Sequence, residues 1–100
     1  LGMSQGLVQK NKGKSADQVY LKALPFRSIE ELPDIKKNIA SNFIVILRIT
    51  PLAQRNTKEL KKAVEELYAY TASIGGDIAR LGEERIVVTP PSVRIWRGLI

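Results

Sequence analysis

The 100-residue sequence has no cysteine and no histidine. The first absence excludes disulfides, thiolate metal ligands and catalytic cysteines, and the second excludes imidazole ligands and histidine-based acid/base catalysis. The longest apolar run, Phe43 to Leu47, is far shorter than the about 20 residues that a membrane-spanning helix needs. We therefore expect no membrane-spanning helix, no metal, no cofactor and no enzyme activity.

The composition is that of one folded soluble domain. Hydrophobic residues make up 44% of the chain and charged residues 26%, which is too apolar for a disordered protein. Residues 1–17 are rich in Gly, Gln, Asn, Lys and Ser, so we expect a flexible N-terminal tail or linker there and a globular domain over residues 18–100. Sixteen basic residues against ten acidic ones give a formal net charge of +6. With no signal-peptide core at the N-terminus, a cytoplasmic protein is expected.

The hydrophobic pattern predicts the element order β-α-β-α-β-β. The strands are expected at 19–24, 42–49, 76–81 and 85–89, with a possible edge strand at 93–96. A short turn capped by Ser28, whose hydroxyl would accept from the amide of Glu31, should precede a helix over 33–40. After a loop at 50–55, Asn56 or Thr57 should cap a second helix that ends near Gly75.

The strand at 42–49 has no alternation of polar and apolar residues, which is typical of a central strand covered on both faces. Helical crossovers predict an α/β (α+β) sandwich with two helices on one face of a mixed sheet. The opposite face would then be a large exposed apolar patch, so we predict a homodimer that packs through the sheet. The expected interface residues are Phe43, Ile44, Ile46 and Tyr68.

Motifs for catalysis are weak. Gly75-Gly76 closes a helix and opens a strand, the reverse of a dinucleotide-binding loop, so a helix end with close backbone packing is the simpler interpretation. Glu30, Glu31 and Asp34 gather at a helix start, where negative charge is favourable without any metal. We interpret Asp77 as an acceptor that stabilises a turn.

The basic residues near the C-terminus are ambiguous. Arg80, Arg85, Arg94 and Arg97 lie in or beside the last strands. Together they could form a patch for an acidic peptide or phosphates, or they could be a solvated sheet edge that arginines protect from aggregation. The sequence alone does not separate the two interpretations.

Four segments taken together resemble a known family. These segments are residues 19–24, 42–52, 73–82 and 86–90, and the most specific is the run I-G-G-D-I-A-R-L-G at 74–82, which follows a helix and precedes an apolar strand that ends at proline. Their order and spacing resemble the globular domain of the SepF cell-division family, and the archaeal members more than the bacterial ones. The resemblance covers residues 18–97.

The resemblance implies a non-catalytic, dimeric adaptor. Family members bind the C-terminal tail of the tubulin-like GTPase FtsZ and tie its filament to the inner membrane surface at the division site. Carried onto matching positions, Arg80, Ile86 and Val88 would line the groove for the tail, and Gly75 and Gly76 would shape it. Family members also carry an N-terminal amphipathic membrane helix, which residues 1–17 do not match.

Two positions in the second predicted helix bear on how far the dimer assembles. Bacterial members have an aromatic residue and a glycine where this sequence has Glu66 and Ala69, so the resemblance implies a simple dimer rather than polymers.

The alternative function is a small basic nucleic-acid-binding dimer of the Alba type. Glu83 and Glu84 at the predicted hairpin tip disfavour it, because such a protein needs a basic hairpin. A hydrolase or transferase would need paired carboxylates that the sequence does not supply.

Overall fold

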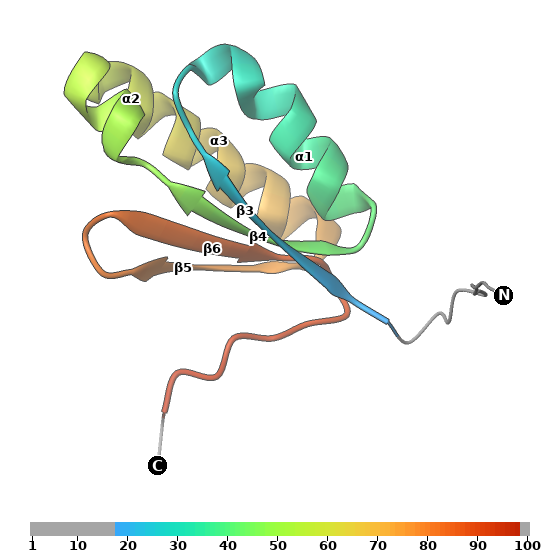
Figure 1. Cartoon of the computed structure of the whole chain (residues 1–100). Coiled ribbons are helices and arrows are strands. Elements are labelled where there is room, and N and C mark those ends of the chain that lie inside the picture. Colours follow the sequence, from blue (N-terminus) through green and yellow to red (C-terminus); the bar gives the residue numbers. More distant parts are fainter. Residues whose placement is uncertain (1–17, 99–100) are drawn as a thin grey trace, which may run out of the picture.

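The computed structural model describes residues 18–98, which form a mixed four-stranded sheet with helices packed on one face (Figure 1). In chain order the elements are β3 (Tyr20–Pro25), the 3-10 helix η2 (Ile29–Glu31), α1 (Leu32–Ala40), β4 (Phe43–Arg48), α2 (Thr50–Arg55), α3 (Thr57–Ile74), β5 (Asp77–Leu81) and β6 (Arg85–Thr89). In space the strands lie in the order β3-β4-β6-β5, with β3 parallel to β4 and the other pairs antiparallel. The predicted sandwich is confirmed, as is the order of its four strands and two main helices, with α2 as an additional helix. The tail expected at 1–17 lies outside the described residues.

The core lies between the sheet and the helices α1 and α3. Alternate residues of the two central strands point into it, and the helices face them with their apolar stripes. The buried members of these elements are Leu32, Ile35, Ile39, Val45, Leu47, Ala63, Leu67, Ile86 and Val88. Residues directly opposite in the sheet share a face, so one face is covered by helices and the other, which we call the open face, is not. Helices therefore cover only one face of β4, as the predicted sandwich requires, and the other face of this strand belongs to the open face.

Helix starts and ends follow the sequence with one correction. Asn56 caps α3, because its side-chain oxygen accepts from the amide of Glu59 at 3.1 Å. Before α1, the Ser28 hydroxyl accepts from the amide of Glu30 at 3.2 Å, and not from Glu31 as predicted. The reason is the tight 3-10 turn of η2, in which the Glu31 amide donates to the Ser28 carbonyl instead.

Two other segments differ from the sequence-based prediction. The expected loop at 50–55 is the helix α2, which has a proline in its first turn and buries Leu52 against the core. The expected edge strand at 93–96 does not form, since the Ile95 amide donates to the Asp77 carboxylate at 2.9 Å and not to a strand carbonyl. The segment beyond β6 instead leaves the sheet as irregular chain (Figure 1).

Candidate binding groove

A groove of about 340 Å³ lies between α3 and the sheet edge at β5. Leu60, Val64 and Tyr68 form its apolar wall, and Arg80 of β5 borders it. Tyr68 is 46% exposed, so its ring is available to a partner in the groove. One guanidinium nitrogen of Arg80 donates to the carbonyl of Glu83 at 3.1 Å, which leaves its other donors available. The groove thus combines an apolar wall with an arginine that a hydrogen bond holds in place.

Charged side chains of α3 also border this groove. Lys61 and Glu65 lie on its rim beside Arg80. Their opposite charges keep the rim mixed in sign, so the groove is not a general anion trap. A short polypeptide with apolar side chains and an acidic group would match both the wall and Arg80.

Ile86 and Val88, which the sequence placed in the tail site, lie beneath this surface. Ile86 is 1% exposed and Val88 is fully buried. Ile86 is the direct cross-strand partner of Arg80, and Val88 is the partner of Ile78. Their side chains support the β5 edge from within the core and offer no surface of their own to a partner in this structure.

Gly75 and Gly76 join α3 to β5 at the far end of the strand. Gly75 ends the helix in the left-handed conformation, with φ of 78°. A Cβ at Gly76 would lie 2.2 Å from the carbonyl oxygen of Thr89, so this position requires glycine. Arg80 lies four residues further along the strand, about 14 Å away at 3.4 Å per residue. The two glycines therefore set the path of α3 beside β5 but do not meet Arg80.

The four residues predicted for the dimer interface do not share one surface. Ile44 and Ile46 lie on the open face. Phe43 points to the helix side, where its ring centroid is 6.2 Å from that of Tyr20 and the Lys22 ammonium lies 4.5 Å above it. Tyr68 lines the groove beside α3. The reason is the two-residue period of a strand, which sends neighbouring side chains of β4 to opposite faces.

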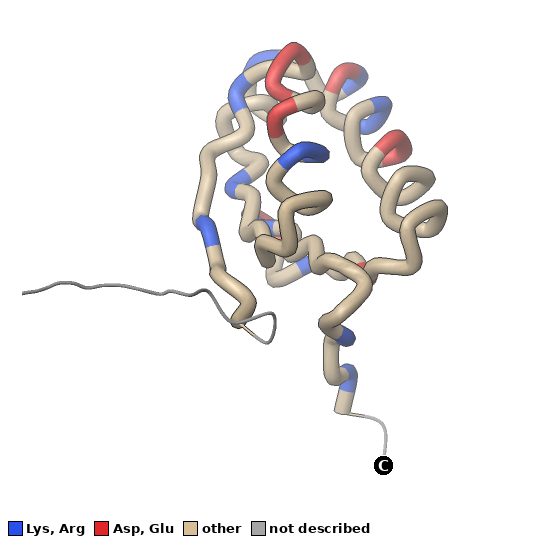
Figure 2. The backbone as a smooth tube through the Cα atoms, turned by 90° about the vertical axis from the view of Figure 1, so that its right-hand side faces the viewer, with Lys and Arg blue, Asp and Glu red and all other residues tan. Residues whose placement is uncertain are grey.

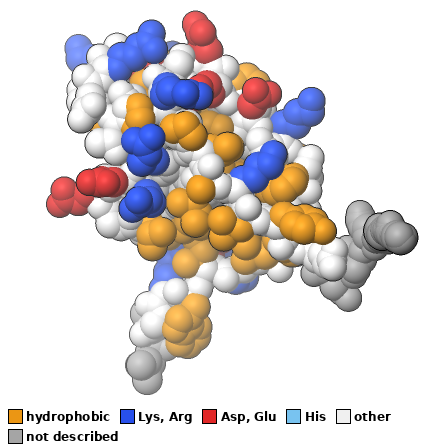
Figure 3. Space-filling view, in the orientation of Figure 1, with side chains coloured by type: hydrophobic (Ala, Val, Ile, Leu, Met, Phe, Trp, Pro, Cys, Tyr) orange, Lys and Arg blue, Asp and Glu red, His pale blue; other side chains and the backbone are white. Residues whose placement is uncertain are grey.

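The open face is apolar. Leu21 and Leu81 at its two edges are 58% and 51% exposed. The register adds half-buried apolar neighbours to the same face, namely Ile44, Ile46, Ala79 and Val87. Figure 3 shows hydrophobic side chains gathered over the strands on this side, with basic side chains beside them. Leu21 and Leu81 were not among the interface residues predicted from the sequence, although the alternation of residues 77–81 places Leu81 on the same face as Ala79.

The four C-terminal arginines do not form one patch. Arg80 borders the groove on the helix side, whereas Arg85 lies on the open face opposite Arg48. Arg97 forms an ion pair with Asp77, whose two carboxylate oxygens each accept from it at 3.0 Å. Along the helices, basic and acidic residues are interspersed (Figure 2). The structure therefore disperses the positive charge over several surfaces.

Asp77 does more than stabilise a turn. Hydrogen bonds from Arg97 above all, and then from the Ile95 and Ile78 amides, hold the pKa of its carboxyl well below the usual range, although burial opposes this shift. The same ion pair raises the pKa of Arg97. Asp77 thus fastens the C-terminal segment to the start of β5. Trp96 lies in this segment and is 80% exposed.

The described residues contain neither a membrane-spanning helix nor a cluster of metal-ligating side chains. None of the helices within residues 18–98 is both long enough and apolar enough to span a membrane. In the same range, Asp and Glu side chains form no group of three or more that could hold a metal ion.

Comparisons with known proteins identify the family. The family model described as Cell division protein SepF matches residues 22–95. A SepF-like protein from Archaeoglobus fulgidus is 27% identical, with a TM-score of 0.74 over 82% of this chain and 98% of its own. One from Pyrococcus furiosus is 28% identical, with a TM-score of 0.73 over 83% of this chain and 100% of its own.

A third solved structure shows the same fold at lower identity. It is the cell division protein SepF from Methanobrevibacter smithii in complex with FtsZ-CTD, which is 17% identical, with a TM-score of 0.70 over 78% of this chain and 98% of its own. No curated protein matches the chain. Because the family model covers most of the globular domain, the chain belongs to the SepF family of cell division proteins.

Proposed function

We propose that this protein is a non-catalytic adaptor of cell division that binds the C-terminal tail of FtsZ in the groove between α3 and β5. The observation that carries the proposal is the pairing of the apolar wall of Leu60, Val64 and Tyr68 with Arg80 in one groove. Family membership supports the same role. The Methanobrevibacter smithii relative, which has the same fold, was solved with FtsZ-CTD.

The groove suits a short extended tail of modest affinity. A few buried side chains of the tail would supply most of the binding free energy, and Arg80 would select an acidic group and fix the direction of the peptide. We expect micromolar binding for one tail, which corresponds to about 8 kcal/mol.

The experiment is a titration of a labelled C-terminal peptide of FtsZ from the same organism. Arg80→Glu should weaken binding roughly tenfold or more, because it replaces an attraction by a repulsion. Arg94→Glu is the matched control, since this exposed residue lies beyond β6 and away from the groove. Equal affinities of the wild type and Arg80→Glu would remove Arg80 from the site, and absence of binding by all three proteins would reject the function.

A second part of the proposal is a homodimer that packs through the open face. Leu21, Ile44, Ile46 and Leu81 all lie on this face, and a monomer would leave their apolar side chains in water. Covering this face leaves the groove beside α3 accessible, because Arg80 and Tyr68 lie on the helix side. Each dimer would then present two tail sites.

The adaptor would act at the inner face of the membrane, at the division site. We assign the attachment to an N-terminal segment outside residues 18–98, as the resemblance to the family implies. Co-sedimentation of the full-length protein with FtsZ filaments, with and without liposomes, tests both connections. Binding to filaments without recruitment to liposomes would reject the membrane link and retain the tail site.

A further inference from the structure

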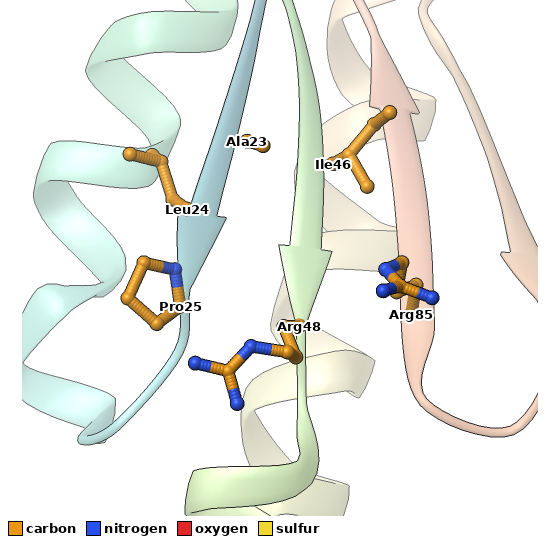
Figure 4. Close-up of a pocket in the computed structure, with 6 residues that line it drawn as sticks. All are labelled: Ala23, Leu24, Pro25, Ile46, Arg48 and Arg85. Carbon is orange, nitrogen blue, oxygen red and sulfur yellow. The ribbon is translucent and has the colours of Figure 1, made fainter.

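A second hollow, of about 200 Å³, lies at one end of the open face (Figure 4). Strands β3, β4 and β6 contribute its lining residues, which are Ala23, Leu24, Pro25, Ile46, Arg48 and Arg85. Only the two arginines carry charge. In Figure 4 the Arg48 side chain extends from β4 toward Pro25, and Arg85 lies on the neighbouring strand β6.

The two arginines are direct cross-strand partners. Their Cα atoms are therefore separated by only about 4.5–5.5 Å, and both side chains leave the same face of the sheet. Like charges directly opposite each other destabilise a sheet, and an anion bound between the two arginines would relieve this repulsion. Among the ion pairs and side-chain hydrogen bonds within residues 18–98, neither guanidinium has a partner, whereas Arg80 and Arg97 both do.

We propose that Arg48 and Arg85 form a binding site for a phosphate group, either free or as a phosphomonoester. A guanidinium presents a rigid fork of N–H donors that matches the oxygens of phosphate, and lysine would not provide this geometry. A phosphomonoester carries about 1.5 to 2 negative charges at neutral pH and so neutralises both arginines. A carboxylate would neutralise only one of them.

The hollow has room for a phosphate group. Ala23, Pro25 and Ile46 give it an apolar lining beside the two exposed arginines. The hollow of about 200 Å³ is several times larger than the volume of one water molecule, which is roughly 30 Å³, so a phosphate group fits. Pro25 has no backbone N–H, so recognition depends on the arginines.

The site is separate from the proposed tail groove. Arg80 faces α3, whereas Arg48 and Arg85 lie on the open face. The proposal therefore does not depend on FtsZ binding. Ile46 lines the hollow and also belongs to the surface that the proposed homodimer covers, so phosphate binding requires that the two copies leave this end of the open face accessible.

The test is a calorimetric titration with inorganic phosphate. The wild type should bind one phosphate per chain, and the double variant Arg48→Gln/Arg85→Gln should bind roughly tenfold more weakly or not at all. The control Lys58→Gln/Lys62→Gln lowers the net charge equally on the exposed side of α3 and should retain the wild-type affinity. Phosphate should also raise the melting temperature of the wild type and the control but not of the double variant. Equal affinities in all three proteins would overturn the proposal.

Vesicles identify the source of the phosphate group. If the site takes a lipid headgroup, phosphatidylcholine vesicles that contain phosphatidic acid will sediment the wild type and the lysine control better than the double variant. If it takes a free phosphomonoester, the double variant and the lysine control will sediment equally, with the calorimetric difference intact. The arginines could instead pair with acidic groups of a second copy. Phosphate would then fail to bind, and the double variant would shift dimers to monomers, which overturns the proposal.

Discussion

Replacing Gly76 with alanine should destabilise this fold more than replacing the adjacent Gly75 with asparagine. A Cβ at position 76 would lie 2.2 Å from the carbonyl oxygen of Thr89 and 3.3 Å from Cγ2 of Thr71. Thr89 is buried and is the cross-strand partner of Asp77, so its carbonyl cannot move without separating the first residue pair of β5 and β6. At Gly75 a Cβ meets nothing within 4 Å.

The magnitudes differ enough to measure. Forcing an extra carbon into packed structure costs about 1–3 kcal/mol, and the loss of a backbone hydrogen bond adds about 1 kcal/mol. We therefore expect Gly76→Ala to lower the free energy of unfolding by about 2–4 kcal/mol, which corresponds to a fall in melting temperature of at least about 8 °C. Gly75→Asn should cost less than about 1 kcal/mol, because asparagine adopts the left-handed conformation most readily after glycine.

Urea unfolding followed by far-ultraviolet circular dichroism is the suitable assay. Fluorescence is not, because Trp96 is 80% exposed in the C-terminal segment and does not report on the core. Equal slopes against urea would show that the variants unfold to similar ensembles, so that midpoints compare stability. If Gly76→Ala and Gly75→Asn have the same midpoint, the close approach between Gly76 and Thr89 does not constrain the fold, and our explanation of this glycine is wrong.

Two further predictions concern the open face and the Asp77 ion pair. Leu21→Lys should be a monomer by light scattering, because Leu21 lies on the open face, where it is 58% exposed. Tyr20→Lys should remain a dimer, because Tyr20, at 57% exposure, lies on the opposite face of β3. If both variants are dimers, the dimer does not pack through the open face. Asp77→Asn should lower the free energy of unfolding by about 1–2 kcal/mol at neutral pH. The effect is no larger because the Arg97 side chain is 46% exposed, so solvent screens the ion pair. Since the pKa of Asp77 is lowered on folding, its contribution is complete above about pH 5 and is lost as the pH falls below the unfolded value of about 3.9. The stability difference between the wild type and Asp77→Asn should therefore narrow in acid, and a constant difference from pH 7 to pH 3 would contradict this role.

Local signals in the sequence were sufficient for most of the fold. The Asn56 cap, the left-handed Gly75 and the apolar period of α3 each depend on residues within a few positions, so each could be predicted from the chain alone. The helix α2 was missed because its six residues carry no hydrophobic period, and only Leu52 packs into the core. The edge strand at 93–96 was predicted wrongly because a distant side chain, Asp77, captures the Ile95 amide.

The candidate groove was harder to predict than the fold. Arg80 could be assigned from the resemblance to the family, but its neighbours Leu60, Val64 and Tyr68 come from a helix that the tertiary fold brings beside β5. Ile86 follows Arg80 by six residues, and the hairpin register makes the two side chains partners on one face. Sequence spacing does not show that one of them is buried beneath the other. Burial depends on how α3 packs, which is a long-range property.

The arrangement of the two surfaces predicts how the dimer and the tail groove should cooperate. A monomer made by Leu21→Lys keeps its groove, so its affinity for a free FtsZ peptide should equal that of the wild type. On a filament, the second tail of a dimer binds from an effective concentration in the millimolar range. Against micromolar binding of one tail, dimerisation should therefore strengthen filament binding by roughly 1,000-fold without any new contact. Leu21→Lys should therefore lose filament binding in sedimentation while retaining peptide binding, and Arg80→Glu should lose both. A Leu21→Lys protein that binds filaments as tightly as the wild type would show that the open face has no part in recruitment.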